Sequence, residues 1–245
     1  MRTSNPLLND STFSSSAAIP GEKQMTLQGT VNKTGILLFL TFATAIYTWD
    51  MVMTRPETAM TWVIGGAIAG FVLALITSFK PAWSPVTGSL YALAEGLFLG
   101  GISAMYERQF QGIALQAILL TGGTCLALLA AYSMRLIRAT ENFKLGIFAA
   151  TGGIAMVYLV TIVLGFFNIQ IPYIHDSGLI GIGFSAVVVV IAALNLVLDF
   201  DFIENGCTHG APKYMEWYAA FGLLVTLVWL YIEILRLLSK LARRD

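Results

Sequence analysis

The sequence predicts an all-α membrane protein, a bundle of seven transmembrane helices, and two observations carry this prediction. The 245 residues are 57% hydrophobic and only 11% charged, with a mean hydropathy of +0.75, which is too apolar for a soluble domain of this length. The chain also contains uncharged runs long enough to cross the membrane, since a helix needs about 20 residues to span roughly 30 Å of hydrocarbon. The lipid bilayer is therefore the expected surrounding of this chain.

Seven runs are expected to cross the membrane, each as one helix. Five of them reach the required length: 58–79, 81–106, 109–134, 145–174 and 177–198. Two are shorter, namely 34–49, which lies between Lys33 and Asp50, and 217–232, which ends at Glu233. Both are counted, because charged side chains at helix ends can extend toward the headgroups.

A transmembrane β-barrel is the competing architecture, and the residue pattern argues against it. Barrel strands are about 10 residues long and alternate in polarity. The run 187–194, Val-Val-Val-Val-Ile-Ala-Ala-Leu, shows no alternation. The pattern therefore favours helices.

The chain divides into three parts. Residues 1–33 contain many serines and few large apolar side chains, which is typical of a disordered polar tail. Residues 34–240 are the expected seven-helix domain, and residues 241–245 form a short basic tail. No short apolar core with a small-residue cleavage site comes first, so we expect 34–49 to remain as the first span rather than to be cleaved.

The distribution of Lys and Arg between alternate loops predicts a cytoplasmic amino terminus. With that orientation only Arg55 and Arg108 lie in outside loops. The carboxyl tail disagrees, because seven crossings put Arg236, Lys240, Arg243 and Arg244 outside. Either the tail is an exception to the rule or the last segment does not fully cross. The inside segments hold Arg2, Lys23, Lys33, Lys80, Arg135, Arg138, Lys144 and Lys213.

The cysteines and histidines indicate neither a metal site nor a cofactor. Cys125 falls within the fourth span and Cys207 in the loop after the sixth, so the two thiols differ in membrane depth and no disulfide is expected. His175 and His209 both fall in loops, where a solvated side chain is the expected state.

Glu95 lies in the middle of the third span. A charge at that depth costs at least about 2.5–3.5 kcal/mol, so the carboxyl must face protein or water, or be protonated. It is either a neutral, hydrogen-bonded group that helps to pack the bundle or part of an ion or proton pathway.

A cluster of carboxylates ends the sixth span. Asp199 and Asp201 are two residues apart, so on a helix they point to nearly opposite sides. Asn195 lies one turn before Asp199 on the same face. This makes Asp199 the expected interior residue and the pH-responsive group, with Asp201 at the headgroups; the alternative is that both simply cap the helix end.

Lys80 ends the second span on the same side of the membrane as Asp199. An ion pair between them would hold Asp199 ionised and release it on protonation, as a pH latch does. The alternative is that Lys80 only anchors its helix at the cytoplasmic surface.

Small residues recur at helix-packing spacing. They are Gly66 and Gly70 in the second span and Gly96 and Gly100 in the third. Glycines four residues apart let helix backbones approach closely, so this pattern predicts a compact bundle.

The order of these features resembles the Bax inhibitor-1 family of membrane proteins, in the bacterial branch that includes the YccA-like proteins. The residues that carry the resemblance are the run 94–100 in the third span, 79–81 before it, the Asp199 run and 234–238. The resemblance implies a seven-helix bundle with the last helix central and a place in the bacterial inner membrane. It also implies a calcium leak controlled by pH through a pair of aspartates on the last two spans.

The resemblance carries over unevenly to the individual residues. Asp199 is similar to the first aspartate of the pair. Aligned on Arg236, the chain has Thr226 where the second is expected, which leaves the paired latch absent or altered. Glu233 lies two turns further on the same face and is a substitute carboxylate only if the pore geometry shifts. Arg236 or Lys240 is the alternative partner of Glu233.

The leading expectation is therefore a pH-sensitive cation leak or channel, with calcium as the transported ion and no cofactor. Oxygen ligands suit calcium, although the chain shows no dense ligand cluster. The alternative is a non-transporting protein that binds and regulates another membrane protein, for instance a membrane protease. An intramembrane aspartyl protease ranks last, because Asp199 and Asp201 face apart on one helix. No enzymatic activity and no nucleic-acid partner are expected, since the chain has no nucleophile elbow, phosphate loop or basic patch.

Overall fold

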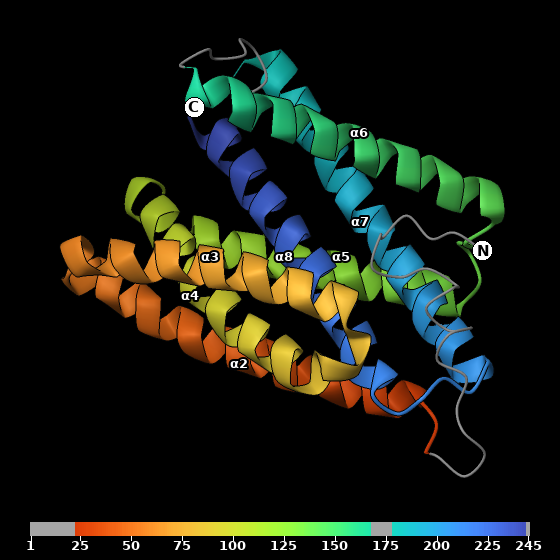
Figure 1. Ribbon diagram of the computed structural model, residues 1–245. Helices are drawn as coiled ribbons and strands as arrows, with labels where there is room; N and C mark the ends of the chain where they lie inside the picture. The colour runs from red at the N-terminus through yellow and green to blue at the C-terminus, as the bar shows by residue number, and fades with distance from the viewer. Residues whose placement is uncertain (1–22, 168–177, 244–245) are drawn as a thin grey trace.

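The computed structural model describes residues 23–167 and 178–243, and seven long α-helices dominate this part of the chain (Figure 1). Each helix is long and apolar enough to cross a membrane. The predicted all-α fold of seven transmembrane helices is therefore confirmed. The helices are α2 (Leu27–Thr54), α3 (Pro56–Phe79), α4 (Ser84–Gln109), α5 (Ile113–Ser133), α6 (Glu141–Phe166), α7 (Leu179–Thr208) and α8 (Met215–Ala242), with a short 3-10 helix, η1 (Pro81–Trp83), before α4.

Several helices extend beyond the apolar runs that predicted them. α2 begins at Leu27, so residues 27–33 are helical rather than part of the expected polar tail. The Thr26 hydroxyl caps this helix by accepting the Gly29 N–H at 3.1 Å, a signal that a hydropathy count does not contain. Residues 1–22 of the expected tail lie outside the described residues.

α7 likewise continues to Thr208, ten residues past its predicted end. Cys207 therefore lies in the last turn of α7 and not in a loop, and both cysteines of the chain are free thiols. His209 follows α7 directly and is exposed. His175 lies outside the described residues.

Apolar side chains cover the outside of the bundle, whereas many polar ones are buried within it. Phe39, Phe71, Leu119 and Leu159 are each more than 60% exposed. This is the arrangement expected in a solvent of lipid chains, where an apolar surface costs nothing and polar groups need partners inside the protein.

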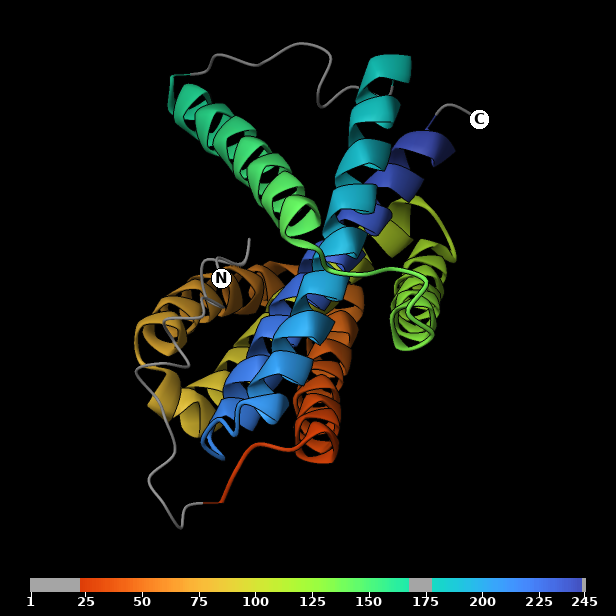
Figure 2. The same cartoon turned by 90° about the vertical axis from the view of Figure 1, so that its right-hand side faces the viewer.

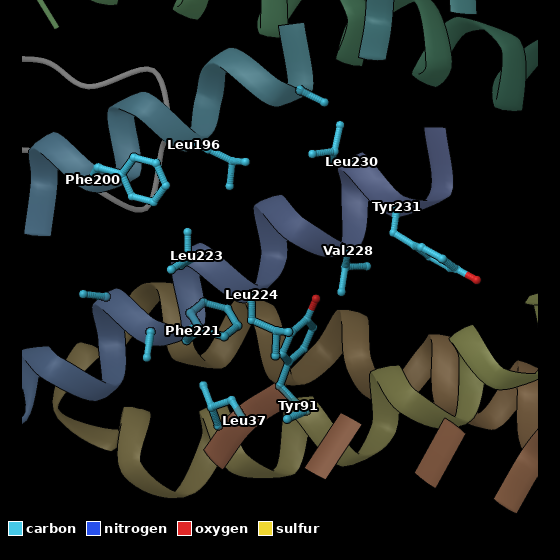
Figure 3. Close-up of a cluster of buried hydrophobic side chains, with 14 of the residues drawn as sticks. Leu37, Tyr91, Leu196, Phe200, Phe221, Leu223, Leu224, Val228, Leu230 and Tyr231 are labelled. Atoms are coloured by element: carbon cyan, nitrogen blue, oxygen red, sulfur yellow. The ribbon is translucent and has the colours of Figure 1, made fainter. Parts of the chain in front are cut away.

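The last helix, α8, occupies the centre of the bundle, as predicted. It contacts α2, α4, α5 and α7, and 67% of its spanning stretch is buried, against 11% for α6. Figure 3 shows its side chains meeting Leu37 of α2 and Tyr91 of α4 on one side and Leu196 of α7 on the other. The ring of Phe221 on α8 packs edge-on against Tyr91, with 5.0 Å between the ring centroids.

α4 lies between α2 and α3 and depends on glycine for its close approach to both. A Cβ atom on Gly96 would lie 2.0 Å from Oγ1 of Thr44, and one on Gly100 would lie 2.1 Å from the carbonyl oxygen of Ala45. On the other side, a Cβ on Gly66 would lie 2.7 Å from the carbonyl oxygen of Ala94. The helix-packing role predicted for these glycines is confirmed.

The first and last described helices are joined at one end of the bundle. The Glu216 carboxylate of α8, whose side chain is fully buried, accepts from the backbone N–H and hydroxyl of Thr26 at 2.9 and 2.8 Å. It also forms ion pairs with Lys33 of α2 and with Lys213, the latter at 2.7 Å. At the same end, the Ser84 hydroxyl of α4 donates to the carbonyl of Tyr214. The starts of α2, α4 and α8 thus share one side, as seven alternating crossings require.

α6 stands apart from α2, α3 and α4 in both views of the bundle (Figures 1 and 2). Its main neighbour is α7. The bundle therefore has a compact part built on α4 and α8 and one peripheral helix.

The glycine contacts of α4 predict a specific loss of stability. Gly100→Ala should lower the free energy of unfolding by about 1–3 kcal/mol, because the new methyl group meets backbone rather than a movable side chain. The matched control is Gly122→Ala on α5, where the space around a Cβ is open. Thermal melting of both variants in the same detergent tests this, and equal melting temperatures would contradict the packing described.

Candidate functional site

Six charged side chains of the described residues are more than nine-tenths buried, and most of them lie on or beside α8. Taking a charge out of water within the membrane is costly, so each burial needs a partner or a function. Three of these residues, Glu95, Asp199 and Glu233, are site candidates from the sequence. The full set is Glu95, Lys144, Asp199, Glu216, Glu233 and Lys240.

Asp199 lies inside the protein, where the sequence placed it. Its exposed fraction is 1%, and Asn195, one turn earlier on α7, is 5% exposed. The Asn195 amide donates to the Thr151 hydroxyl of α6 at 2.9 Å and to the carbonyl of Ile191 at 2.8 Å. The shared interior face predicted for Asn195 and Asp199 is therefore confirmed.

Asp201 lies on a different face of α7 from Asp199, as its helical spacing predicts. It is not only a side chain at the headgroups, because its carboxylate has partners within the protein. Its carboxylate forms an ion pair with Nζ of Lys144 on α6 at 2.8 Å and accepts from the Asn205 amide at 2.9 Å. The Lys144 side chain is only 5% exposed. Asp201 thus belongs to an interhelical ion pair with Lys144, a residue whose positive charge in the sequence indicates only the membrane orientation.

The ion pair that the sequence allows between Lys80 and Asp199 does not form. Lys80 is exposed, and its Nζ lies over the ring of Trp83, 4.5 Å from the centroid. The reason is the packing of α3, which lies against α2 and α4. This exposed position at the end of α3 agrees with the alternative interpretation of Lys80, in which it only anchors its helix at the membrane surface.

Thr226 occupies the position where the resemblance expects a second aspartate. It is 5% exposed, and its hydroxyl donates to the Gly222 carbonyl of its own helix at 3.3 Å. α7 and α8 are antiparallel neighbours, and the hydrogen bond from Lys240 to Ser185 sets their register. This register brings the turn of Asp199 beside residues 222–226, so a hydroxyl lies at the depth where a carboxylate was expected.

Glu233 is held by an ion pair within α8. Its carboxylate accepts from Nη1 of Arg236 at 3.2 Å and from the hydroxyl of Tyr158 on α6 at 2.8 Å. Arg236 also donates to that hydroxyl at 2.7 Å. Of the two cations named from the sequence, Arg236 is therefore the partner, whereas Lys240 bonds Gly181 and Ser185 of α7. A neutralised Glu233 does not substitute for a free second carboxylate.

Glu95 belongs to a different part of the bundle, the contact of α4 with α3. It is 8% exposed, and a Cβ on Gly70 of α3 would lie 2.8 Å from Oε2 of Glu95. Gly70 thus leaves room for the carboxyl. The structure brings Asp199, Asn195 and Thr226 into one region and Glu233 to its edge, but it keeps Glu95 and Lys80 apart from them.

Among the described residues, no three His, Cys, Asp or Glu side chains come close enough to hold a metal ion. The buried carboxylates are instead distributed singly along the helices. Calcium sites use six to eight oxygen ligands, which singly placed carboxylates do not supply by themselves.

The position of Glu95 predicts how its variants behave. Glu95→Lys should destabilise the fold by at least about 2.5–3.5 kcal/mol, because it replaces a buried carboxyl with a longer, oppositely charged group beside Gly70. Glu95→Gln should fold normally. Glu57→Lys, at the exposed start of α3, is the control. Yield of monodisperse protein and melting temperature are the measurements, and a Glu95→Lys variant as stable as the parent would contradict the interior assignment.

Comparison with known proteins supports the resemblance found in the sequence. A family model described as Bax inhibitor 1 like matches residues 5–243. Neither the curated proteins nor the solved structures gave a match to this chain. Because the matched region covers almost the whole chain and contains all seven helices, the chain belongs to the Bax inhibitor-1 like family.

Proposed function

We propose that this membrane protein is a cation leak whose expected ion is calcium and whose pH-responsive group is Asp199. The observation that carries the proposal is the carboxylate of Asp199, 1% exposed on a membrane-spanning helix beside the central α8. Ionisable groups within spans commonly mark ion or proton pathways. Membership of the Bax inhibitor-1 like family supports the same function. The proposal assigns the chain no enzymatic activity and no cofactor.

The proposed pathway runs past the polar side chains between α6, α7 and α8. Asn195 and Thr226 supply neutral oxygens near Asp199, and Glu233 lies further along α8 with its charge balanced by Arg236. A single acidic group at the centre attracts cations without holding them firmly, which is what continuous flux requires. The response to pH then follows the titration of one carboxyl, because Thr226 replaces the second.

Calcium uptake by proteoliposomes across a pH series tests this proposal. Asp199→Asn should flatten the pH dependence of uptake, because the titrating group is lost. The control is Asp50→Asn, which removes an exposed carboxylate of α2. Thr226→Asp should turn a one-step profile into two steps, because two neighbouring carboxyls titrate as a coupled pair. A profile that Asp199→Asn leaves unchanged would remove Asp199 from the pathway.

A second candidate function is regulation of another membrane protein without transport. The observation that favours it is the open space around exposed glycines of α5 and α6, namely Gly122 and Gly123 on α5 and Gly146 and Gly153 on α6. Small residues facing lipid let a further helix approach closely. Absence of calcium flux in liposomes that contain only this protein would favour this second function.

We propose a bacterial inner membrane as the location, with the amino terminus in the cytoplasm. Lys33, Lys80 and Lys213 lie toward the end of the bundle where α2, α4 and α8 begin, and positive side chains favour the cytoplasmic side. With α8 as a seventh crossing, for which it is long and apolar enough, the carboxyl terminus lies outside in this proposal.

Reporter fusions test this orientation. A reporter active only outside the cytoplasm should work when fused after residue 245 and fail when fused at the loop between α3 and α4. The reciprocal cytoplasmic reporter provides the control at both sites. A carboxyl-terminal fusion active only in the cytoplasm would contradict the proposed orientation.

A further inference from the structure

α6 presents a regular face to the rest of the bundle. Lys144, Thr151 and Tyr158 are spaced seven residues apart, with Ile147 and Ile154 between them. On a helix these five positions form one narrow stripe. Lys144, Ile147 and Ile154 are the buried side chains among those of α6 whose burial is described. We call this stripe the α6 seam.

Each polar residue of the α6 seam contacts a polar side chain on α7 or α8. Lys144 pairs with Asp201 at 2.8 Å, and the Thr151 hydroxyl accepts from Asn195 at 2.9 Å. The Tyr158 hydroxyl donates to Glu233 at 2.8 Å. The three contacts are distributed along the helix, so one side of α6 is attached to the bundle by polar contacts at regular intervals.

Polar contacts, more than apolar packing, decide whether α6 stays docked. Lipid chains are as apolar as Leu or Ile side chains, so two apolar helix faces gain little by leaving lipid for each other. α4 is different, because its glycines bring whole backbones into contact with α2 and α3. On α6, Gly146, Gly152 and Gly153 have no atom within 4 Å of a Cβ position. The glycines of α6 therefore bring no helix backbone into close contact, unlike those of α4.

The groups that α6 contacts each have a second partner on their own helix. Loss of α6 would therefore leave none of these three groups on α7 and α8 unsatisfied, which lowers the cost of separation. Lys144 has such a partner too, the carboxylate of Glu141 at 3.5 Å. The second partners on α7 and α8 are Asn205 for Asp201 at 2.9 Å, the Ile191 carbonyl for Asn195 at 2.8 Å and Arg236 for Glu233 at 3.2 Å.

We propose that α6 docks and undocks as a unit through the α6 seam, while the scaffold of α2, α3, α4 and α8 stays in place. The short linker before α6 contains Arg135, a non-glycine residue with φ of 59°, at the point where the chain turns out of α5. Undocking uncovers the side chains of Asn195 and Glu233 on the flank of α7 and α8. The movement is a property of the helix packing and does not depend on the proposed ion flux.

Pulsed electron paramagnetic resonance in lipid nanodiscs measures this movement directly. Spin labels at Met156→Cys on α6 and Val187→Cys on α7 report the separation, since both side chains are exposed to lipid. A control pair on the scaffold uses Phe71→Cys on α3 and Leu90→Cys on α4, also exposed. The native thiols, Cys125 and Cys207, are replaced by alanine throughout.

Three replacements weaken the α6 seam without adding polarity to the helix: Lys144→Met, Thr151→Val and Tyr158→Phe. We expect two distance populations for the α6–α7 pair and one for the scaffold pair. Each single replacement should raise the ratio of long to short distances about threefold, the average effect of an interhelical hydrogen bond in a membrane. Together they should raise it roughly 25-fold if the effects are independent.

Two outcomes would overturn the proposal. One is a single short α6–α7 distance that none of the replacements alters, which would make α6 a fixed part of the bundle. The other is an equal change in the scaffold pair, which would mean that the variants loosen the whole protein. Neither result depends on calcium uptake, so a failure of the proposed function and a failure of this inference are separately visible.

Discussion

Hydrocarbon offers no hydrogen-bond partner to a polar group, and the arrangement of this bundle follows from that constraint. Several buried charged side chains have a partner on another helix or on their own helix, as Lys144 has Asp201 and Glu233 has Arg236. Apolar side chains such as Phe39 and Phe71 are free to face outward. The interior of the bundle therefore differs from its lipid-facing surface in holding the polar groups that need partners, more than in its hydrophobicity.

Two ways of holding helices together coexist in the molecule. Around α4, glycines such as Gly96 and Gly100 allow backbone contact, which gains dispersion energy over a large area and leaves little room for adjustment. Along α6, separate polar contacts hold the helix to α7 and α8 at intervals of about two turns. In contacts of the second kind each group on α7 or α8 has a second partner on its own helix, and this is why we propose that α6 moves against the scaffold.

The seven helices could be predicted from the sequence because each needs about 20 apolar residues, a property visible without any tertiary contact. The helix ends could not be predicted in this way, since α2 and α7 continue through polar residues whose hydrogen bonds are satisfied by caps and ion pairs. Similarly, the burial of Asp199 follows from its helical spacing relative to Asn195. The ion pair with Lys80 that the sequence allowed does not form, because which helices become neighbours is decided by packing that a single helix does not encode. The seven-residue spacing of Lys144, Thr151 and Tyr158 is present in the sequence. These residues are polar, so a pattern of apolar positions does not include them.

The central position of α8 has a consequence for how the protein is made. α8 follows the other six described long helices in the chain, so α2, α4, α5 and α7 enter the membrane before the helix that they all contact has been synthesised. Until then Lys33 of α2 lacks Glu216, and the Ser103 hydroxyl of α4 lacks the Tyr231 hydroxyl that it later meets at 2.6 Å. The early helices α2, α3 and α4 pack on one another through their glycines, and the final helix then supplies the missing polar partners. A chain that stalls before α8 would present these polar groups to the quality-control proteases of the membrane.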